Sequence, residues 1–158
     1  FIYDGFNETD FNGFKQTKLV LDNGATINPS GALRLTNKSY NVIGHAFYPK
    51  AIQMFNTNSS SSPPNVYSFR TNFVFAIIKS SVNRGDHGLA FTLSPSLHFL
   101  GAEAGHFLGI LNKLNDGNST NHIFAVEFDT VNEYQEKSDG NHIGININSM
   151  FSGPSESA

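Results

Sequence analysis

Two carboxylates and a histidine in this chain have the types and spacing of a metal site. Glu127 and Asp129 lie two residues apart in the apolar segment 123–129, and His142 opens a second apolar segment, 142–148. Side chains two apart in a strand share a face, so antiparallel pairing would bring His142 opposite both carboxylates. Neighbouring carboxylates repel unless a cation or a proton lies between them, and imidazole suits Mn²⁺ or Zn²⁺. The spacing alone is equally consistent with a solvated hairpin.

The loop between these two segments offers further oxygen ligands. Asn132, Glu136 and Asp139 could surround Ca²⁺, which takes six to eight oxygens. The alternative is an enzyme, because paired carboxylates also act as nucleophile and general acid in glycoside hydrolases. Such a site usually needs a third acid in phase, and Val131 occupies the next in-phase position. The hydrolase is therefore the weaker hypothesis, and we expect a protein that is not an enzyme.

Short apolar segments separated by Gly, Asn, Ser and Pro would carry these residues. The segments predicted as strands are 18–21, 32–36, 45–49, 51–55, 67–78, 88–93, 107–111, 123–129 and 142–148. Within 67–78, Phe69, Phe73 and Phe75 share one face, which we interpret as core rather than as an exposed stacking surface. No long helix and no repeat is predicted. The pattern indicates an all-β sandwich or barrel.

Composition narrows the class of protein. The 158 residues suit one domain, and 13% aromatic residues, fifteen of them Phe, provide enough apolar surface for a core. The net charge of −3 and the absence of any Lys or Arg run argue against nucleic acid as a partner. No apolar stretch approaches the roughly 20 residues that cross a bilayer.

The chain contains four glycosylation sequons and no cysteine. The sequons begin at Asn7, Asn37, Asn58 and Asn118, whereas Asn28 is disqualified by the proline that follows it. A first residue other than Met fits a mature chain after signal-peptide cleavage. Together these features favour a secreted or extracellular glycoprotein, with the cell surface or the vacuole as compatible locations.

Seven sequence blocks are specific in combination. They are Leu33–Asn37, Ile43–Pro49, Phe69–Ile77, His87–Phe91, Leu108–Asn112, Ala125–Thr130 and His142–Ser149. In this combination the sequence resembles the plant legume (L-type) lectins, most closely the lectin ectodomains of plant receptor kinases. The resemblance implies a concanavalin-like jelly-roll sandwich. Because complete domains of this family have roughly 230–250 residues, it also implies that residues 1–158 form the N-terminal two-thirds of a single legume-lectin domain, with the C-terminal strands missing.

The resemblance assigns a Ca²⁺/Mn²⁺ pair to the group formed by Glu127, Asp129 and His142, called the acidic cluster below. Glu127 resembles the carboxylate that binds only the transition metal, Asp129 the one that bridges both ions, and His142 the imidazole on Mn²⁺. Ser152 falls where the family holds a Mn²⁺-bound water.

On the Ca²⁺ side, a deletion of one residue after the bridging carboxylate keeps the family spacing. Val131 would then supply a backbone carbonyl and Asn132 a side-chain ligand, while Glu136 would take the place of a bridging Asp. Asp139 is a competing ligand. Two positions depart from the family pattern: Glu136 stands where Asp is usual, and Asn146 replaces an acid.

The resemblance also implies a sugar-binding site. The family's sugar-binding Asp precedes Gly-Leu-Ala-Phe, where this chain has His87, with Asp86 one residue earlier. The loop of backbone donors maps to Gly105 and His106, and Asn132 corresponds to the sugar-binding Asn. These five residues are the predicted sugar contacts.

The combined interpretation is a carbohydrate-binding lectin whose Ca²⁺/Mn²⁺ site orders the sugar-binding loops. The expected partners are a carbohydrate or glycoconjugate, a second chain that completes the domain, and further copies in a homo-oligomer. A lectin-like interaction or defence module without ordinary sugar binding is the alternative. Of the other histidines, His45 is expected to be structural, and His98 and His122 to be solvated.

Overall fold

The computed structural model describes residues 2–7, 17–56, 65–78, 87–131 and 140–157. Its strands are β1 (Val20–Asn23), β2 (Thr26–Ile27), β3 (Leu33–Arg34), β4 (Gly44–Phe47), β5 (Gly88–Leu93), β6 (Phe124–Asp129), β7 (His142–Ile147) and β8 (Ser155–Ser157). Two single-turn 3-10 helices, η1 (Gly105–Phe107) and η2 (Ser119–Asn121), lie between β5 and β6. The all-β class predicted from the sequence is confirmed.

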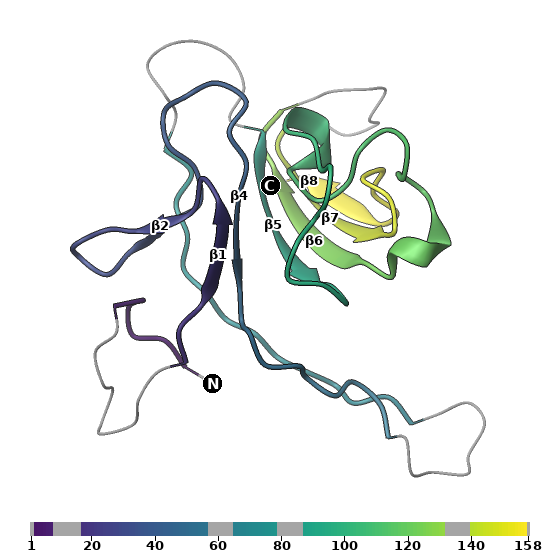
Figure 1. Cartoon of the computed structure of the whole chain (residues 1–158). Coiled ribbons are helices and arrows are strands. Elements are labelled where there is room, and N and C mark those ends of the chain that lie inside the picture. Colours follow the sequence, from purple (N-terminus) through teal and green to yellow (C-terminus); the bar gives the residue numbers. More distant parts are fainter. Residues whose placement is uncertain (1, 8–16, 57–64, 79–86, 132–139, 158) are drawn as a thin grey trace.

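The strands form one large sheet and two small ones, all antiparallel. The large sheet has the order β5-β6-β7-β8, while β1 pairs with β4 and β2 pairs with β3. In Figure 1 the β1–β4 pair stands beside the large sheet. The β2–β3 hairpin projects away from the β1–β4 pair, on the side opposite the large sheet. The long connection from β5 to β6 crosses one face of the large sheet.

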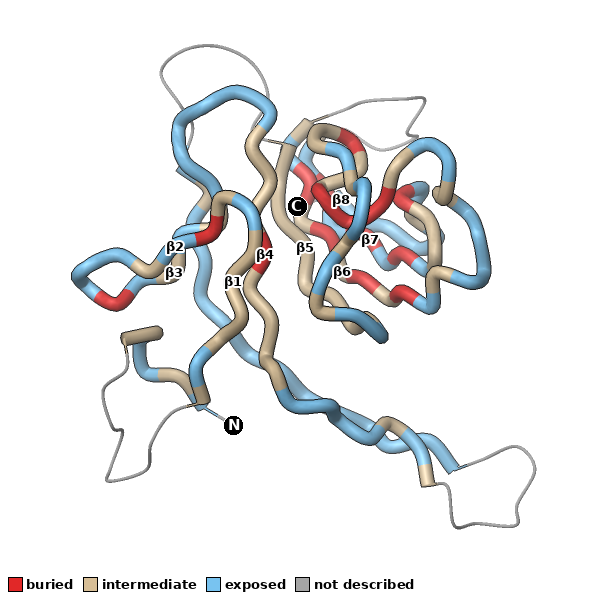
Figure 2. Tube along the Cα trace, viewed as in Figure 1, coloured by how far each residue is buried: buried red, intermediate tan, exposed pale blue. Residues whose placement is uncertain are grey.

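Alternation along β6 and β7 places polar side chains on the covered face of the large sheet. Glu127 and Asp129 of β6, and His142 and Asn146 of β7, are all buried. Val126 and Phe128 of β6, and Ile143 and Ile145 of β7, lie on the opposite, more open face. Figure 2 shows the resulting stripe of buried positions along both strands. The face of β6 and β7 that carries the polar residues is therefore the buried face of the sheet.

A small apolar core covers the rest of this interior face. Its buried members are Ile110, Leu111, Ile123, Ala125 and Met150. Four of the five come from the β5–β6 connection or from the segment after β7, so these segments supply the second layer. The connection therefore both covers the polar residues of the sheet and carries candidate sugar contacts.

The phenylalanine-rich segment differs from its prediction. Residues 67–78 form no assigned strand, and Phe69, Phe73 and Phe75 are between 43% and 50% exposed. Their rings do pack on the open face of the large sheet: Phe75 lies 4.7 Å from Phe128, centroid to centroid. The prediction that this row packs as core on the sheet face therefore holds for one side of the rings, and the other side is still exposed among the described residues.

Two further strand predictions need correction. Residues 51–55 contribute only one isolated bridge, between Phe55 and Val66. The segment 107–111 is not a strand, because Leu108 and Gly109 adopt positive φ and fold the backbone into turns. The other predicted strands are present, with boundaries shifted by up to two residues. Within the described residues, no helix is long and apolar enough to cross a membrane.

Candidate functional site

The two carboxylates and the histidine singled out by the sequence do lie on neighbouring strands. In the β6–β7 ladder Asp129 is the register partner of His142, and Glu127 is the partner of Gly144. The side chains of Glu127 and His142 are 2% and 1% exposed. Buried charge of this kind must be paired or hydrogen-bonded, because water cannot solvate it.

Glu127 is the centre of a buried hydrogen-bond network. Its Oε2 accepts from the Asn146 amide at 2.9 Å, and its Oε1 lies 3.3 Å from His142 Nε2. The Ser152 hydroxyl contacts the same Oε1. Gly144 makes room for this arrangement, since a Cβ there would lie 2.5 Å from Glu127 Oε1. The carboxylate is therefore satisfied by protein groups.

Asp129 occupies a different electrostatic environment. Burial raises the pKa of this carboxyl, and the nearby charge of Glu127 raises it further. The backbone N–H of Val131, which donates to Asp129 Oδ1 at 2.7 Å, opposes the shift. Two buried carboxylates whose mutual repulsion is not fully offset would be stabilised by a cation.

The donor chemistry fits a transition-metal ion, although the side chains do not surround one point. Among the described residues, no group of three or more His, Asp or Glu is placed to hold an ion. However, Glu127, Asp129 and His142 supply carboxylate and imidazole donors in one buried place, and His142 Nδ1 has no hydrogen-bond partner there. Asn132, Glu136 and Asp139 lie outside the described residues, so Val131 and the bridging Asp129 are the described members of the Ca²⁺ set.

The described candidate sugar contacts His87 and Gly105 lie at the end of the large sheet where Asp129 pairs with His142. Gly88 pairs with Asp129, and the backbone N–H of Thr130 donates to the His87 carbonyl at 3.3 Å. The His87 ring lies beside Gly105, because a Cβ on Gly105 would be 3.6 Å from His87 Nε2. The fold thus brings the segment at His87 and the segment at Gly105 close to Asp129 of the acidic cluster.

The His106 side chain has a different environment from that of His87. Its side chain is buried, with the ring centroid 5.1 Å from that of Phe107 and 5.2 Å from that of Phe151. This imidazole packs into the domain, so backbone groups of the segment are the better candidates for ligand contacts. Asp86 and Asn132, the other predicted sugar contacts, lie outside the described residues.

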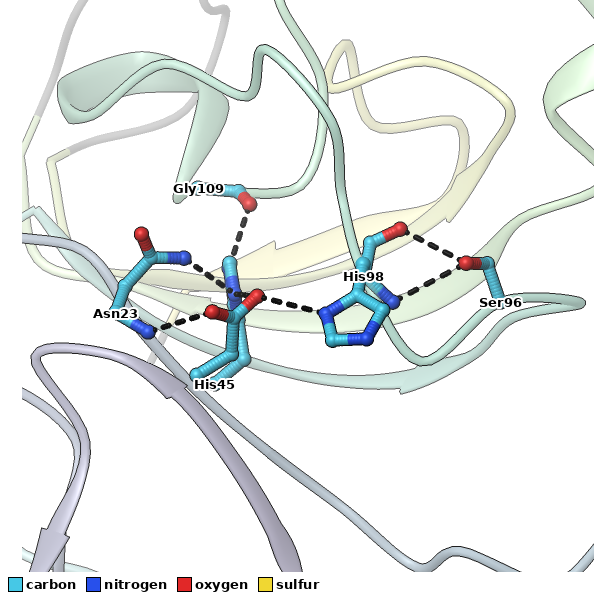
Figure 3. A network of polar contacts seen from close by, with 6 residues as sticks. Asn23, His45, Ser96, His98 and Gly109 are labelled. Atoms are coloured by element: carbon cyan, nitrogen blue, oxygen red, sulfur yellow. Dashed lines mark hydrogen bonds and ion pairs between the residues drawn. The ribbon is translucent and has the colours of Figure 1, made fainter.

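A second polar network ties the β1–β4 pair to the β5–β6 connection (Figure 3). His45 Nε2 is 2.7 Å from the Gly109 carbonyl oxygen, and His45 Nδ1 is 3.3 Å from Asn23 Nδ2. His98 Nδ1 is 3.2 Å from Asp22 Oδ2. His45 is structural, as expected from the sequence, but His98 has an acidic partner that sequence spacing did not indicate, because the two residues are 76 positions apart.

Acid unfolding should depend on Asp22. Hydrogen bonds from His98 and from the Asn23 backbone hold the pKa of Asp22 below its usual 3.8. Such a carboxylate stabilises the fold above the unfolded-state pKa, and the contribution is lost as pH falls through the folded-state pKa. We expect Asp22→Asn to lower the Tm slightly at neutral pH, the pair being near the surface, and not at all in strong acid. Thermal unfolding between about pH 7 and about pH 2, with Glu156→Gln as control, checks this.

Comparison with known proteins identifies the family. The sequence profile of the legume lectin domain matches residues 1–158. This chain belongs to the legume lectin family. It is 48% identical over 154 residues to Lectin-domain containing receptor kinase VI.3 of Arabidopsis thaliana, covering 96% of the chain and 22% of that protein. It is 40% identical over 150 residues to L-type lectin-domain containing receptor kinase SIT2 of Oryza sativa subsp. japonica, covering 94% and 22%.

Solved legume lectins share the fold. Lectin II from Ulex europaeus superposes with a TM-score of 0.70 at 28% identity, covering 91% of this chain and 61% of that one. Lectin UEA-II complexed with galactose gives a TM-score of 0.68 at 27% identity, covering 89% and 60%. The predicted jelly-roll lectin fold is thereby confirmed. This lectin chain spans about a fifth of its receptor-kinase relatives and about 60% of these solved lectins.

Three sequon asparagines, Asn7, Asn37 and Asn118, lie within the described residues and outside the strands. Asn37 and Asn118 are exposed, and Asn7 is half-buried. Asn118 Oδ1 accepts from Thr120 N at 3.0 Å and from Thr120 Oγ1 at 2.8 Å, so the two polar residues of that sequon are in contact. Asn58 lies outside the described residues. The described sequons are therefore compatible with glycan attachment at Asn37 and Asn118 without rearrangement of the core.

Proposed function

We propose that this chain is an extracellular carbohydrate-binding domain, with its sugar site where the β5–β6 connection meets the acidic cluster. The observation that carries the proposal is that three parts of the chain meet: the start of β5, the segment around Gly105, and the end of β6. His87 lies beside Gly105, and Gly88 pairs with Asp129. Binding sites of this kind place backbone donors and a few side chains on loops above a rigid sheet. The relative UEA-II, complexed with galactose, supports a sugar as ligand.

The proposed site includes a Ca²⁺/Mn²⁺ pair that acts through positioning. Glu127, Asp129 and His142 would hold the transition metal, and Val131, Asn132 and Glu136, together with the shared Asp129, would hold Ca²⁺. When bound, the ions would neutralise the buried carboxylates and order the loop that carries Asn132. The protein residues would then contact the sugar by hydrogen bonds.

A glycan array tests the proposed function. The chain is supplied with Ca²⁺ and Mn²⁺ in one sample and treated with a chelator in a parallel sample. Binding that is lost on chelation supports the metal-ordered site, whereas binding that survives chelation supports a sugar site without the metal pair. A chain that binds no glycan in either sample, although its circular dichroism shows it folded, would contradict the proposal.

One observation favours the alternative, a lectin-like interaction or defence module. His87 stands where the family has a sugar-binding Asp, and an imidazole replaces the acceptor pair of a carboxylate. A carboxylate can accept from two sugar hydroxyls at once, whereas an imidazole offers at most one accepting ring nitrogen. Restoring the family residue with His87→Asp is the matched variant: if only the variant binds glycans on the array, the alternative function is favoured.

The hydrolase hypothesis gains no support from the geometry. Glu127 is 2% exposed, and three side chains contact its carboxylate. A nucleophile or general acid must reach the substrate, and Glu127 cannot do so without disrupting this network.

We also propose that β-strands from outside this chain complete the domain. The open face of the large sheet carries exposed Ile143, Ile145 and Ile147, and the half-exposed phenylalanines lie over its other part. A contiguous apolar face of this kind marks a binding surface. The solved lectins extend well beyond the 60% that this chain covers, so their remaining strands are the proposed occupant. These strands would come from a longer protein or from a second chain.

Ile145→Asp is expected to have different effects in two settings. In the isolated chain water can solvate much of the new carboxylate at this 39% exposed position, and we expect less aggregation and only a small loss of stability. In the chain joined to the remaining lectin strands the carboxylate would be buried, and we expect a loss of about 2–4 kcal/mol. Urea unfolding and light scattering measure both effects.

Leu114→Asp is the control for this comparison, because Leu114 is exposed and lies on the β5–β6 connection. We expect it to be neutral in both settings. A similar, small effect of Ile145→Asp in both settings would contradict completion of the sheet. Concentration-dependent self-association of the isolated chain, removed by Ile145→Asp, would instead show that a second copy covers the face.

A further inference from the structure

His45 makes a buried contact between elements far apart in the sequence. It lies on β4, is 7% exposed, and places Nε2 2.7 Å from the carbonyl oxygen of Gly109 (Figure 3). A carbonyl only accepts, so Nε2 carries the hydrogen and donates it. The Asn23 amide nitrogen lies 3.3 Å from His45 Nδ1 and only donates, so Nδ1 accepts. These two partners hold the His45 ring between Asn23 and Gly109.

The segment that receives this hydrogen bond holds Leu108 in a left-handed backbone conformation. Gly105, Leu108 and Gly109 all have positive φ, at 77°, 48° and 74°. A left-handed conformation costs a non-glycine residue such as Leu108 about 1–2 kcal/mol, so surrounding contacts must maintain it. Within the segment, the N–H of Gly109 donates to the Glu103 carbonyl at 2.9 Å. His45 adds an anchor from outside the segment.

The close approach of β4 to this segment leaves no spare room. A Cβ on Gly109 would lie 3.1 Å from His45 Nε2 and 3.0 Å from the Ile43 side chain. The His45 ring is also held edge-on against Phe99, with centroids 5.1 Å apart. The ring therefore has a fixed position from which to hold the Gly109 carbonyl.

We propose that His45 is a positioning residue for the carbohydrate-binding loop. Gly105, four residues before the anchored Gly109, is the residue that lies beside His87. By fixing Gly109, His45 keeps the Gly105–His106 backbone in place against His87. The inference rests on the proposed function for its consequence in sugar binding, whereas the anchoring itself does not.

Three variants separate positioning from general stability. His45→Ala removes the donor, His45→Gln keeps an N–H donor of similar reach, and His122→Ala removes an exposed histidine from the same connection. Hydrogen exchange is measured at the bonded amides of Leu108, Gly109 and Ile110, well below the Tm. Glycan affinity is measured on the same samples.

We expect His45→Ala to accelerate exchange at these amides roughly tenfold relative to the amides of β6 and β7. Glycan affinity should fall by a similar factor, and His45→Gln should restore most of both losses. His122→Ala should match the wild type.

Two results would overturn the proposal. One is unchanged exchange at Leu108–Ile110 in His45→Ala; the other is equal acceleration throughout β6 and β7, which indicates general destabilisation. A wild-type chain that binds no glycan would contradict the proposed function, and the exchange result would still decide whether His45 anchors the loop.

Discussion

Gly88→Ala should remove a large part of the stability of this domain. Gly88 has a φ of 128°, which L-residues avoid, and a Cβ there would collide with the backbone carbonyl of Phe128 and lie 3.0 Å from Asp129 Cα. Both obstacles are backbone atoms of the paired strand β6, so no side-chain rotation relieves the contact. Strain and overpacking together predict a loss of roughly 3–5 kcal/mol, measured by urea unfolding. Small domains have only about 5–15 kcal/mol in total.

Gly117→Ala is the matched control. Gly117 also has a positive φ, 79°, but no atom lies within 4 Å of an added Cβ. We expect it to lose only the conformational term of about 1–2 kcal/mol. If the two variants unfold at the same urea concentration, the close approach of β5 to β6 at Gly88 is not as tight as described. A residual folded population of Gly88→Ala should also lose glycan binding, because His87 and Asp129 flank the collision.

Sequence reasoning located the β6–β7 hairpin because its signal is local. Alternation of apolar and polar residues in Ala125–Thr130 and His142–Ser149 defines both the strands and the shared face of Glu127 and Asp129. The same reasoning failed at 107–111, where the apolar run is part of a turn. Its positive φ values depend on contacts such as His45 with Gly109, and no short-range pattern reports a partner 64 residues away.

The phenylalanine row shows a different limit. Alternation correctly predicted that Phe69, Phe73 and Phe75 share a face against the sheet. It could not predict how deeply they are buried, because burial depends on a second layer and not on the strand itself. Likewise, Asn146 was noticed as a departure from an acid, but its role as donor to Glu127 required the register of β6 and β7.

Asn146→Asp is expected to make the stability of the domain depend on a divalent cation. Asn146 donates to Glu127 Oε2 at 2.9 Å, and both side chains are almost completely buried. The substitution keeps the size of the side chain but replaces a donor with a second carboxylate. Leaving a buried charge without its partner and next to a like charge should cost roughly 3–5 kcal/mol in a chelated sample.

Added Mn²⁺ should restore much of this loss in Asn146→Asp and change the wild type less, because the wild-type amide already stabilises Glu127. Thermal unfolding with Mn²⁺ and with chelator measures both differences, and Asn72→Asp, which adds a carboxylate at an exposed position, is the control. An Asn146→Asp variant whose Tm is the same in both solutions would show that no cation reaches this cluster. A wild type that loses as much stability on chelation as the variant would show that the amide does not replace the ion. The expected result means that the side chain of Asn146 determines how strongly the stability of this lectin domain depends on a metal ion at the acidic cluster.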